Sequence, residues 1–121
     1  MTFTAERDAD GRELRRECRY ALSGPLPASR LWTLHAEDPG RVPILDRSGR
    51  AGSLNSFETL FAPEGAIAVS VSAQPAAGNW LAISGTGPMS LVLTFYDTPL
   101  SGDADLTGIG LPSISAASCD G

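Results

Sequence analysis

The sequence predicts an all-β protein, an antiparallel β-sandwich that is jelly-roll-like and carries one short helical segment. Apolar and polar side chains alternate with a period of two in several short runs, which is the pattern of half-buried strands. These runs are rich in β-branched and aromatic residues, and turn signals separate them roughly every 8 to 12 residues. A chain of 121 residues is the size of one domain, so we expect residues 1–121 to form a single domain.

The expected strands share short length, alternation and flanking Gly or Pro residues. They are residues 2–7, 18–23, 30–36, 41–46, 67–72, 80–83 and 89–96. The pattern is weakest at the first and fourth of these. Pro43 confines the fourth to a sheet edge or an irregular stretch, because proline cannot donate a backbone hydrogen bond.

The first two strands are expected to form a hairpin around the sequence DADG at residues 8–11. A competing interpretation makes Asp10 the N-cap of a charged helix, with Glu13 three residues later. Only Leu14 and Cys18 of that helix would face a core, which favours the hairpin.

One segment departs from the period of two and predicts one or two helical turns. Its apolar residues recur three, six and seven positions after the first, and Ser53 precedes them as an N-cap. Those apolar residues are Leu54, Phe57, Leu60 and Phe61.

The chain has two cysteines, Cys18 and Cys119, and one histidine, so it cannot supply the four ligands of a structural zinc site. The cysteines either form a disulfide or remain as two inert thiols. We favour the disulfide, which would tie down a Gly- and Ser-rich, loop-like tail at residues 97–121. A disulfide implies an oxidising compartment such as the periplasm or cell envelope.

Charge and hydropathy argue against two classes of partner. The net charge is −5, all nine basic residues are Arg, and none lies beyond Arg50. Binding to nucleic acid is therefore not expected, because phosphates require Lys and Arg to displace counterions. No run approaches the roughly 18 apolar residues of a spanning helix. Membrane attachment is expected only through an N-terminal anchor, and none is visible in this sequence.

Asn79 and Trp80 are the first candidate ligand-binding residues, because they lie where a turn meets a strand. A Trp ring in such a position can stack on a sugar or an apolar ring while Asn supplies hydrogen bonds. The alternative is that Trp80 closes one end of the core and that Asn79 adopts a left-handed turn conformation.

His35, Glu37 and Asp38 are the second candidate group, and the first two share a face if their strand continues. Such a group suits acid/base chemistry, or ligation of a hard cation together with Asp46 or Asp97. The alternative is a solvated strand end followed by an Asp-Pro-Gly turn. The sequence has no nucleophile elbow, phosphate loop or dinucleotide motif, so it designates no catalytic residue, metal site or cofactor.

The order of several short motifs resembles the domain of unknown function (DUF) 1214 family, from about Cys18 to Asp97 and in close bacterial relatives through Cys119. The motifs are Cys18 and Tyr20 on one strand, the Gly24-Pro25 step, Trp32-Thr33-Leu34 followed by Asp38 and Gly40, Gly78-Asn79-Trp80-Leu81, Tyr96-Asp97-Thr98-Pro99, and Leu111-Pro112 with Ile114. The resemblance implies a β-sandwich without an established activity. It also implies relatives in the bacterial envelope, some with an N-terminal membrane helix and some with a second β-rich domain.

These observations support three hypotheses of function. The first is a non-catalytic envelope module that binds a small molecule, a carbohydrate or a protein partner. The second is a hydrolase-type enzyme that uses His35 and carboxylates at a loop rim. The third is a structural domain that packs against a part of the protein missing from this sequence.

Overall fold

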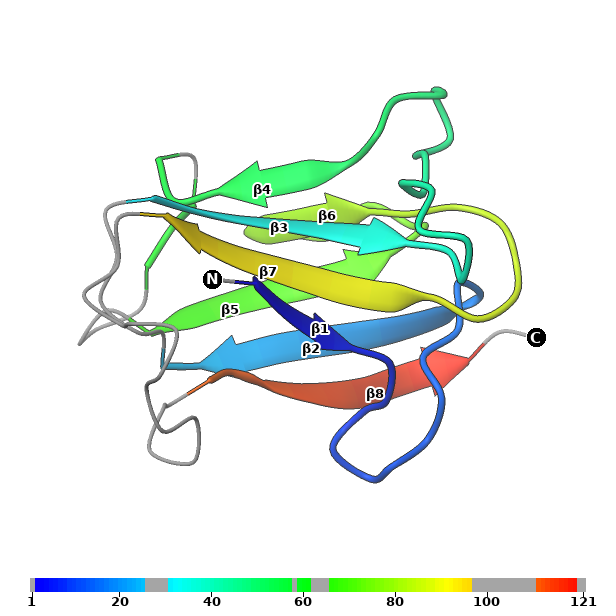
Figure 1. Ribbon diagram of the computed structural model, residues 1–121, viewed down its shortest axis with the longest axis horizontal. Helices are drawn as coiled ribbons and strands as arrows, with labels where there is room; N and C mark the ends of the chain where they lie inside the picture. The colour runs from blue at the N-terminus through cyan, green and yellow to red at the C-terminus, as the bar shows by residue number, and fades with distance from the viewer. Residues whose placement is uncertain (1, 26–30, 58, 62–65, 97–110, 120–121) are drawn as a thin grey trace.

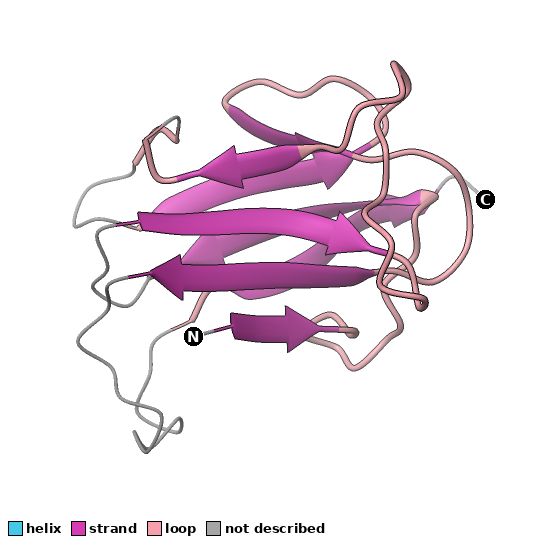
Figure 2. Cartoon of the chain, turned by 45° about the horizontal axis from the view of Figure 1, so that its top comes forward, coloured by secondary structure: helices cyan, strands magenta, loops and turns pink. Residues whose placement is uncertain are grey.

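The computed structural model describes residues 2–25, 31–57, 59–61, 66–96 and 111–119. Within these residues it contains eight strands and no helix (Figure 2). The strands are β1 (Thr2–Ala5), β2 (Cys18–Gly24), β3 (Leu31–Glu37), β4 (Ser53–Asn55), β5 (Ile67–Ser72), β6 (Asn79–Ala82), β7 (Ser90–Tyr96) and β8 (Ser113–Cys119). None of the described residues forms a helix that could span a membrane.

The strands form two four-stranded sheets that lie one behind the other in Figure 1. Sheet 1 has the order β1-β7-β3-β4, and sheet 2 has the order β6-β5-β2-β8. Their inner faces share one hydrophobic core, to which Leu34 and Phe95 contribute from sheet 1 and Val71 and Leu81 from sheet 2. The all-β fold predicted from the alternating pattern is confirmed.

Alternation on β3 decides which residues reach the surface of sheet 1. Trp32, Leu34 and Ala36 are buried, whereas the residues between them are partly exposed. Because successive side chains of a strand point to opposite faces, His35 and Glu37 lie on the outer face. The neighbouring strand β7 is paired with β3 along its whole length, from Leu31↔Tyr96 to Glu37↔Ser90.

One strand pair departs from the expected antiparallel arrangement. β5 and β6 run parallel, with Val69 opposite Asn79 and Ser72 opposite Ala82. The connection between them is short for a parallel pair, which usually needs a crossover of a dozen or more residues. The Trp80 indole N–H donates to the Ser72 carbonyl at 3.0 Å and holds this connection against the sheet. Sheet 2 is therefore mixed, and the jelly-roll-like connectivity stays a prediction.

The expected hairpin between the first two strands is wrong at the level of the sheets. A tight turn does form at residues 8–11, with Arg7 bridged to Glu13. However, β1 pairs with β7 in sheet 1, and β2 pairs with β5 and β8 in sheet 2. After the turn the chain crosses from sheet 1 to sheet 2. Leu14 lies in this crossing segment and stabilises it, because its side chain is fully buried in the core.

The predicted helical segment is not observed in residues 53–57 and 59–61, the part of it that the structure describes. Ser53–Asn55 forms β4, an edge strand that pairs with β3. The backbone N–H of the next residue, Ser56, donates to the Trp32 carbonyl. The apolar spacing that suggested a helix does not mark a buried face, because Phe57 is 81% exposed and Leu60 is 70% exposed. Glu58, between them, lies outside the described residues.

Two weaker expectations also change. Residues 41–46 form isolated bridges, Glu37↔Pro43 and Leu45↔Ala51, in place of a strand. Within the expected loop-like tail, Ser113–Cys119 forms β8, while residues 97–110 lie outside the described residues. The strand was missed because most of its residues are Ser and Ala, and only Ile114 is buried, so no alternating pattern reveals it.

The predicted disulfide between Cys18 and Cys119 is confirmed. The two residues stand directly opposite each other on β2 and β8, with their Cα atoms 4.0 Å apart. The bond joins residues separated by 101 positions and fixes the end of β8 to a buried strand.

Replacing Cys119 with Ser should lower the free energy of unfolding by several kcal/mol. The chain-entropy model assigns roughly 4 to 5 kcal/mol to a bond that closes a loop of this length. Urea unfolding of the variant, with Ser118→Ala as the control on the same strand, measures the loss. Equal unfolding midpoints for wild-type protein with and without reductant would contradict the prediction.

Candidate functional site

Three turns of the same construction occur at residues 8–12, 38–42 and 46–50. Each begins with an Asp whose N–H donates to the carbonyl four residues later, at 2.7 to 2.9 Å. The Asp carbonyl accepts from the residue three positions later, and the Asp Oδ1 accepts from the N–H four positions later. A β-bridge closes each turn on its outer side. These are three-residue hairpin loops of the kind that ends in a left-handed residue.

The left-handed position is glycine in two of the turns and arginine in the third. Gly11 and Gly49 have φ values of 80° and 89°, and Arg41 has a φ of 64°. Among the described residues, Arg41 is the only non-glycine residue with a positive φ. This backbone conformation is costly for a residue with a Cβ atom. The Asp38 turn therefore holds Arg41 in a strained conformation.

A basin of about 740 Å³ lies on the outer face of sheet 1 between two of these turns. Thr2 and Thr4 of β1 and Ser90 of β7 line it from the sheet. Glu6 and Glu13 flank the Asp8 turn, and Glu37, Asp38 and Arg41 lie at the Asp38 turn. The basin thus combines hydroxyl groups, carboxylates and one guanidinium with apolar surface, and its apolar lining residues are Pro39, Pro88, Met89 and Val92.

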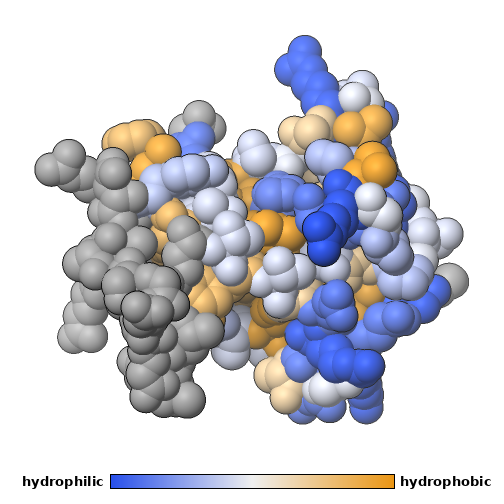
Figure 3. Space-filling view, in the orientation of Figure 1, coloured by the Kyte–Doolittle hydropathy of each residue, from blue (hydrophilic) through white to orange (hydrophobic). Residues whose placement is uncertain are grey.

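Among the residues that the structure describes, charged side chains concentrate at the same end of the molecule. In Figure 3 the most hydrophilic residues gather at the right, at the end where Figure 1 shows the loops that follow β1 and β3. This distribution agrees with the sequence, in which every basic residue precedes Ala51.

His35 and Glu37 come together as predicted for residues on one strand face. The His35 Nε2 and Glu37 Oε2 atoms are 3.2 Å apart, and both side chains are partly exposed. Val92, opposite His35 on β7, is buried beneath the outer face. Glu37 and Val92 line the basin, whereas His35 is not among its lining residues.

The other carboxylates proposed as partners of His35 serve the turns. Asp38 Oδ1 accepts the Val42 N–H at 3.0 Å, and Asp46 Oδ1 accepts the Ser48 hydroxyl at 2.6 Å. The Ser48 hydrogen bond is the main cause that lowers the pKa of Asp46. Asp97 lies outside the described residues. No group of three or more His, Cys, Asp or Glu side chains that could hold a metal occurs in the part of the chain that the structure describes.

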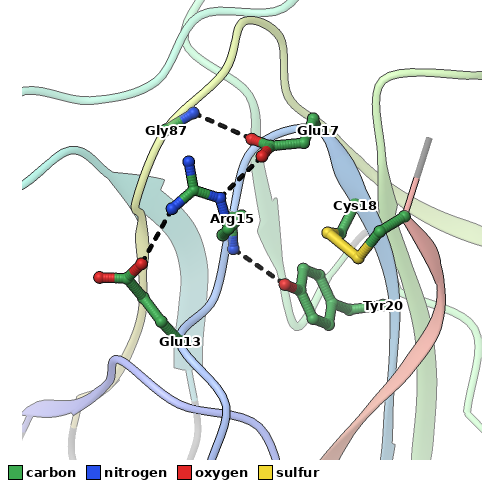
Figure 4. A network of polar contacts seen from close by, with 7 residues as sticks. Glu13, Arg15, Glu17, Cys18, Tyr20 and Gly87 are labelled. Carbon is green, nitrogen blue, oxygen red and sulfur yellow. Dashed lines mark hydrogen bonds and ion pairs between the residues drawn. A yellow bond between two sulfur atoms is a disulfide. The ribbon is translucent and has the colours of Figure 1, made fainter. Parts of the chain in front are cut away.

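A polar network that includes the basin residue Glu13 fixes the segment that precedes β7 (Figure 4). Arg15 Nε donates to Glu17 Oε2 at 2.7 Å, and Glu17 Oε1 accepts the Gly87 N–H at 2.9 Å. Arg15 also contacts Glu13 at 3.0 Å, and its N–H donates to the Tyr20 hydroxyl at 2.8 Å. The Arg15 hydrogen bond, followed by that of Gly87, lowers the pKa of Glu17 to about 2.

Asn79 and Trp80 lie on sheet 2, away from the basin on sheet 1. Asn79 is buried, and its amide binds the Leu60 N–H at 2.8 Å, the Leu60 carbonyl at 2.7 Å and the Ala68 carbonyl at 3.0 Å. Trp80 is half-buried and bonded to Ser72. Both residues hold the fold together at this edge, and their role in ligand binding stays a prediction.

The polar residues of the basin that the sequence did not reveal are Thr2, Thr4, Glu6, Glu13, Arg41 and Ser90. The repeated pattern of Asp followed three residues later by Gly, at residues 8–11 and 46–49, marks two of the three turns. No local signal reveals the basin, because its lining comes from strands far apart in the sequence.

Comparison with known proteins identifies the family. Residues 1–100 match the model of a family described as a protein of unknown function (DUF1214). The chain belongs to the DUF1214 family. No functionally curated protein matches this DUF1214 domain.

Two solved structures share the fold of the DUF1214 domain. The VPA0106 protein from Vibrio parahaemolyticus has a TM-score of 0.77 at 16% sequence identity, and the match covers 97% of this chain and 30% of that one. A putative uncharacterized protein from Burkholderia cenocepacia has a TM-score of 0.56 at 19% identity, with 84% and 26% covered. The chain therefore spans less than a third of the length of either structure.

Arg41→Gly should stabilise the domain, because glycine adopts a positive φ without the steric cost that arginine pays. The expected gain in the free energy of unfolding is about 1 kcal/mol. Arg47→Gly is the matched control, since Arg47 lies in the Asp46 turn at an ordinary φ and should gain nothing. Urea unfolding measures the free energy of unfolding of the two variants. Equal changes in this free energy would contradict the assignment of strain to Arg41.

Glu17→Gln should destabilise the domain at neutral pH and reduce its sensitivity to acid. The pKa of Glu17 is lowered from 4.5 to about 2, so its stabilising effect is complete above pH 4.5. That effect is lost as the pH falls through about 2. The difference in stability between wild type and variant should therefore shrink as the pH is lowered from 4.5 to 2. Glu6→Gln serves as the control for loss of a nearby charge, and a difference that does not vary with pH would contradict the prediction.

Proposed function

We propose that the DUF1214 domain is a non-catalytic binding module of the cell envelope that takes a small polyhydroxylated ligand in the basin on sheet 1. The observation that carries this proposal is the construction of the basin between two turns, each closed by its own aspartate. A volume of about 740 Å³ falls within the range typical of small-molecule sites. Walls held in place in this way lose little entropy when a ligand binds.

The lining supports a ligand rich in hydroxyl groups, such as a carbohydrate. Thr2, Thr4 and Ser90 can each donate and accept a hydrogen bond, and Glu37 and Asp38 accept from sugar hydroxyls. Arg41 adds a donor at the rim. Charge-assisted hydrogen bonds to the carboxylates and the guanidinium would be the stronger contacts.

Placement in the periplasm or envelope is part of the same proposal. The Cys18–Cys119 disulfide is compatible with an oxidising compartment, because cytosolic thiols are kept reduced. Any membrane attachment would come from an anchor preceding this domain.

Fewer observations support the alternative that the domain is a hydrolase. It requires His35 and two carboxylates to converge on one substrate. His35 contacts Glu37, while Asp38 Oδ1 is engaged in closing its own turn. If the domain were a hydrolase, His35→Ala would abolish turnover in a screen of glycoside and ester substrates. Turnover that survives this substitution would remove His35 from consideration.

A glycan array followed by calorimetric titration tests the binding proposal. Ser90→Arg, which places a long side chain in the basin, should weaken the binding of any retained glycan by about tenfold or more. Ser115→Arg, on the exposed outer face of sheet 2, is the matched control and should bind as wild type does. Absence of any glycan ligand, or equal affinity in both variants, would overturn the proposal.

A further inference from the structure

Arg41 occupies a position that the two similar turns of this domain give to glycine. The three turns that begin with an aspartate share the same backbone hydrogen bonds, and the third residue after the aspartate is Gly11, Arg41 or Gly49. A glycine adopts the positive φ of this position without steric cost, whereas an arginine does not. Closure of the turn therefore does not explain why the Asp38 turn carries an arginine.

Strain of this kind is typical of positions whose side chain serves a ligand. The Arg41 side chain is exposed, and it lines the basin from the Asp38 turn. No ion pair joins Arg41 to a carboxylate within the residues that the structure describes. Its guanidinium is therefore free to bind an acidic group that a ligand brings into the basin.

The carboxylates of the basin differ from Arg41, because most of them are already engaged within the protein. Glu13 Oε2 lies 3.0 Å from Arg15 Nη1, and Glu37 Oε2 lies 3.2 Å from His35 Nε2. Asp38 accepts a backbone hydrogen bond through Oδ1 and so closes its own turn. These contacts reduce the repulsion that an acidic ligand would meet in a basin lined by four carboxylates and one guanidinium.

Glu6 and Arg41 are the remaining charged groups of the lining, and they belong to different turns. Glu6 precedes the Asp8 turn, whereas Arg41 lies in the Asp38 turn. We propose that Arg41 determines the specificity of the basin by binding the carboxylate of an acidic sugar such as a uronic acid. This inference rests on the proposed function, which places a polyhydroxylated ligand in the basin.

A uronic acid matches the lining through both kinds of group that it carries. The planar guanidinium of Arg41 can donate two parallel hydrogen bonds to one carboxylate, and such charge-assisted bonds are stronger than bonds between neutral groups. The ring hydroxyls of the sugar can bond to Thr2, Thr4 and Ser90, and they can donate to Glu6. The ligand thus places its negative charge at the Asp38 turn.

Glu6 gives an independent test of the sign of the ligand's charge. Glu6→Gln keeps a hydrogen-bond acceptor for sugar hydroxyls but removes a negative charge from the basin. An acidic sugar should therefore bind this variant about twofold or more tightly than it binds the wild type. A ligand with an ammonium group would instead bind the variant more weakly.

A glycan array that carries neutral, acidic and amino-sugar glycans, followed by calorimetric titration, tests the role of Arg41. Wild-type protein should retain glycans that contain a uronic acid. It should bind them about tenfold or more tightly than the counterpart in which the carboxylate is reduced to a hydroxymethyl group. Arg41→Gly should lose this preference while its free energy of unfolding rises, so that misfolding cannot account for the loss.

Two further variants separate the guanidinium from a general effect of charge. Arg47→Gly removes an arginine from the Asp46 turn, does not alter the lining of the basin, and should keep the wild-type preference for the acidic glycan. Arg41→Lys keeps the positive charge without the planar pair of donors, and should keep only part of the preference.

The outcomes distinguish this inference from the proposed function on which it rests. Equal affinity of the wild type for the acidic glycan and its neutral counterpart would overturn the role of Arg41 but not the binding of glycans. Unchanged preference in Arg41→Gly would do the same, as would retention of amino-sugar glycans that Glu6→Gln binds more weakly. A wild-type protein that retains no glycan of any class would overturn both.

Discussion

The burial of Trp32, Leu34 and Ala36 on β3 is the constraint on which the candidate site depends. These side chains pack into the core shared by the two sheets, and their burial leaves His35 and Glu37 on the outer face. A shift of the β3 register by one residue would reverse the arrangement, placing a histidine and a carboxylate in an apolar core. The large energetic cost of that state keeps the floor of the basin in place.

The three turns closed by Asp8, Asp38 and Asp46 hold the loops of the domain in defined conformations. One carboxylate oxygen accepts two backbone N–H groups in the Asp8 and Asp46 turns and one in the Asp38 turn, so each loop has a defined conformation without packing into the core. The Asp38 turn keeps this conformation although Arg41 occupies the position that favours glycine. Strain of this kind persists only where the surrounding bonds determine the backbone. At Arg41 it places a guanidinium at the rim of the basin.

The two outer faces of the sandwich differ in chemistry. Sheet 1 presents hydroxyl groups and carboxylates around a basin. Sheet 2 presents small side chains beside Leu60 and Phe61. One core supports both faces, because inward residues of each strand pack against the other sheet while outward residues are free to vary.

Several elements were predictable because their cause is local. Strands such as β2, β5 and β7 follow from alternation along a few residues, which reports a half-buried face directly. The turn at Asp8 follows from the sequence DADG at residues 8–11, whereas the turn at Asp46 was not predicted. The disulfide could be inferred because the chain has only two cysteines and therefore one possible intramolecular pairing.

The sequence by itself thus determined an all-β chain, most of its strands and its one disulfide. Only the tertiary structure decided that β1 and β2 belong to different sheets, that β8 is a strand, and that Phe57 and Leu60 are exposed. The basin and the bond from Glu17 to Gly87 were likewise decided by the fold. The physical reason is distance along the chain: these features depend on pairing between segments tens of residues apart, which no local pattern of side chains encodes.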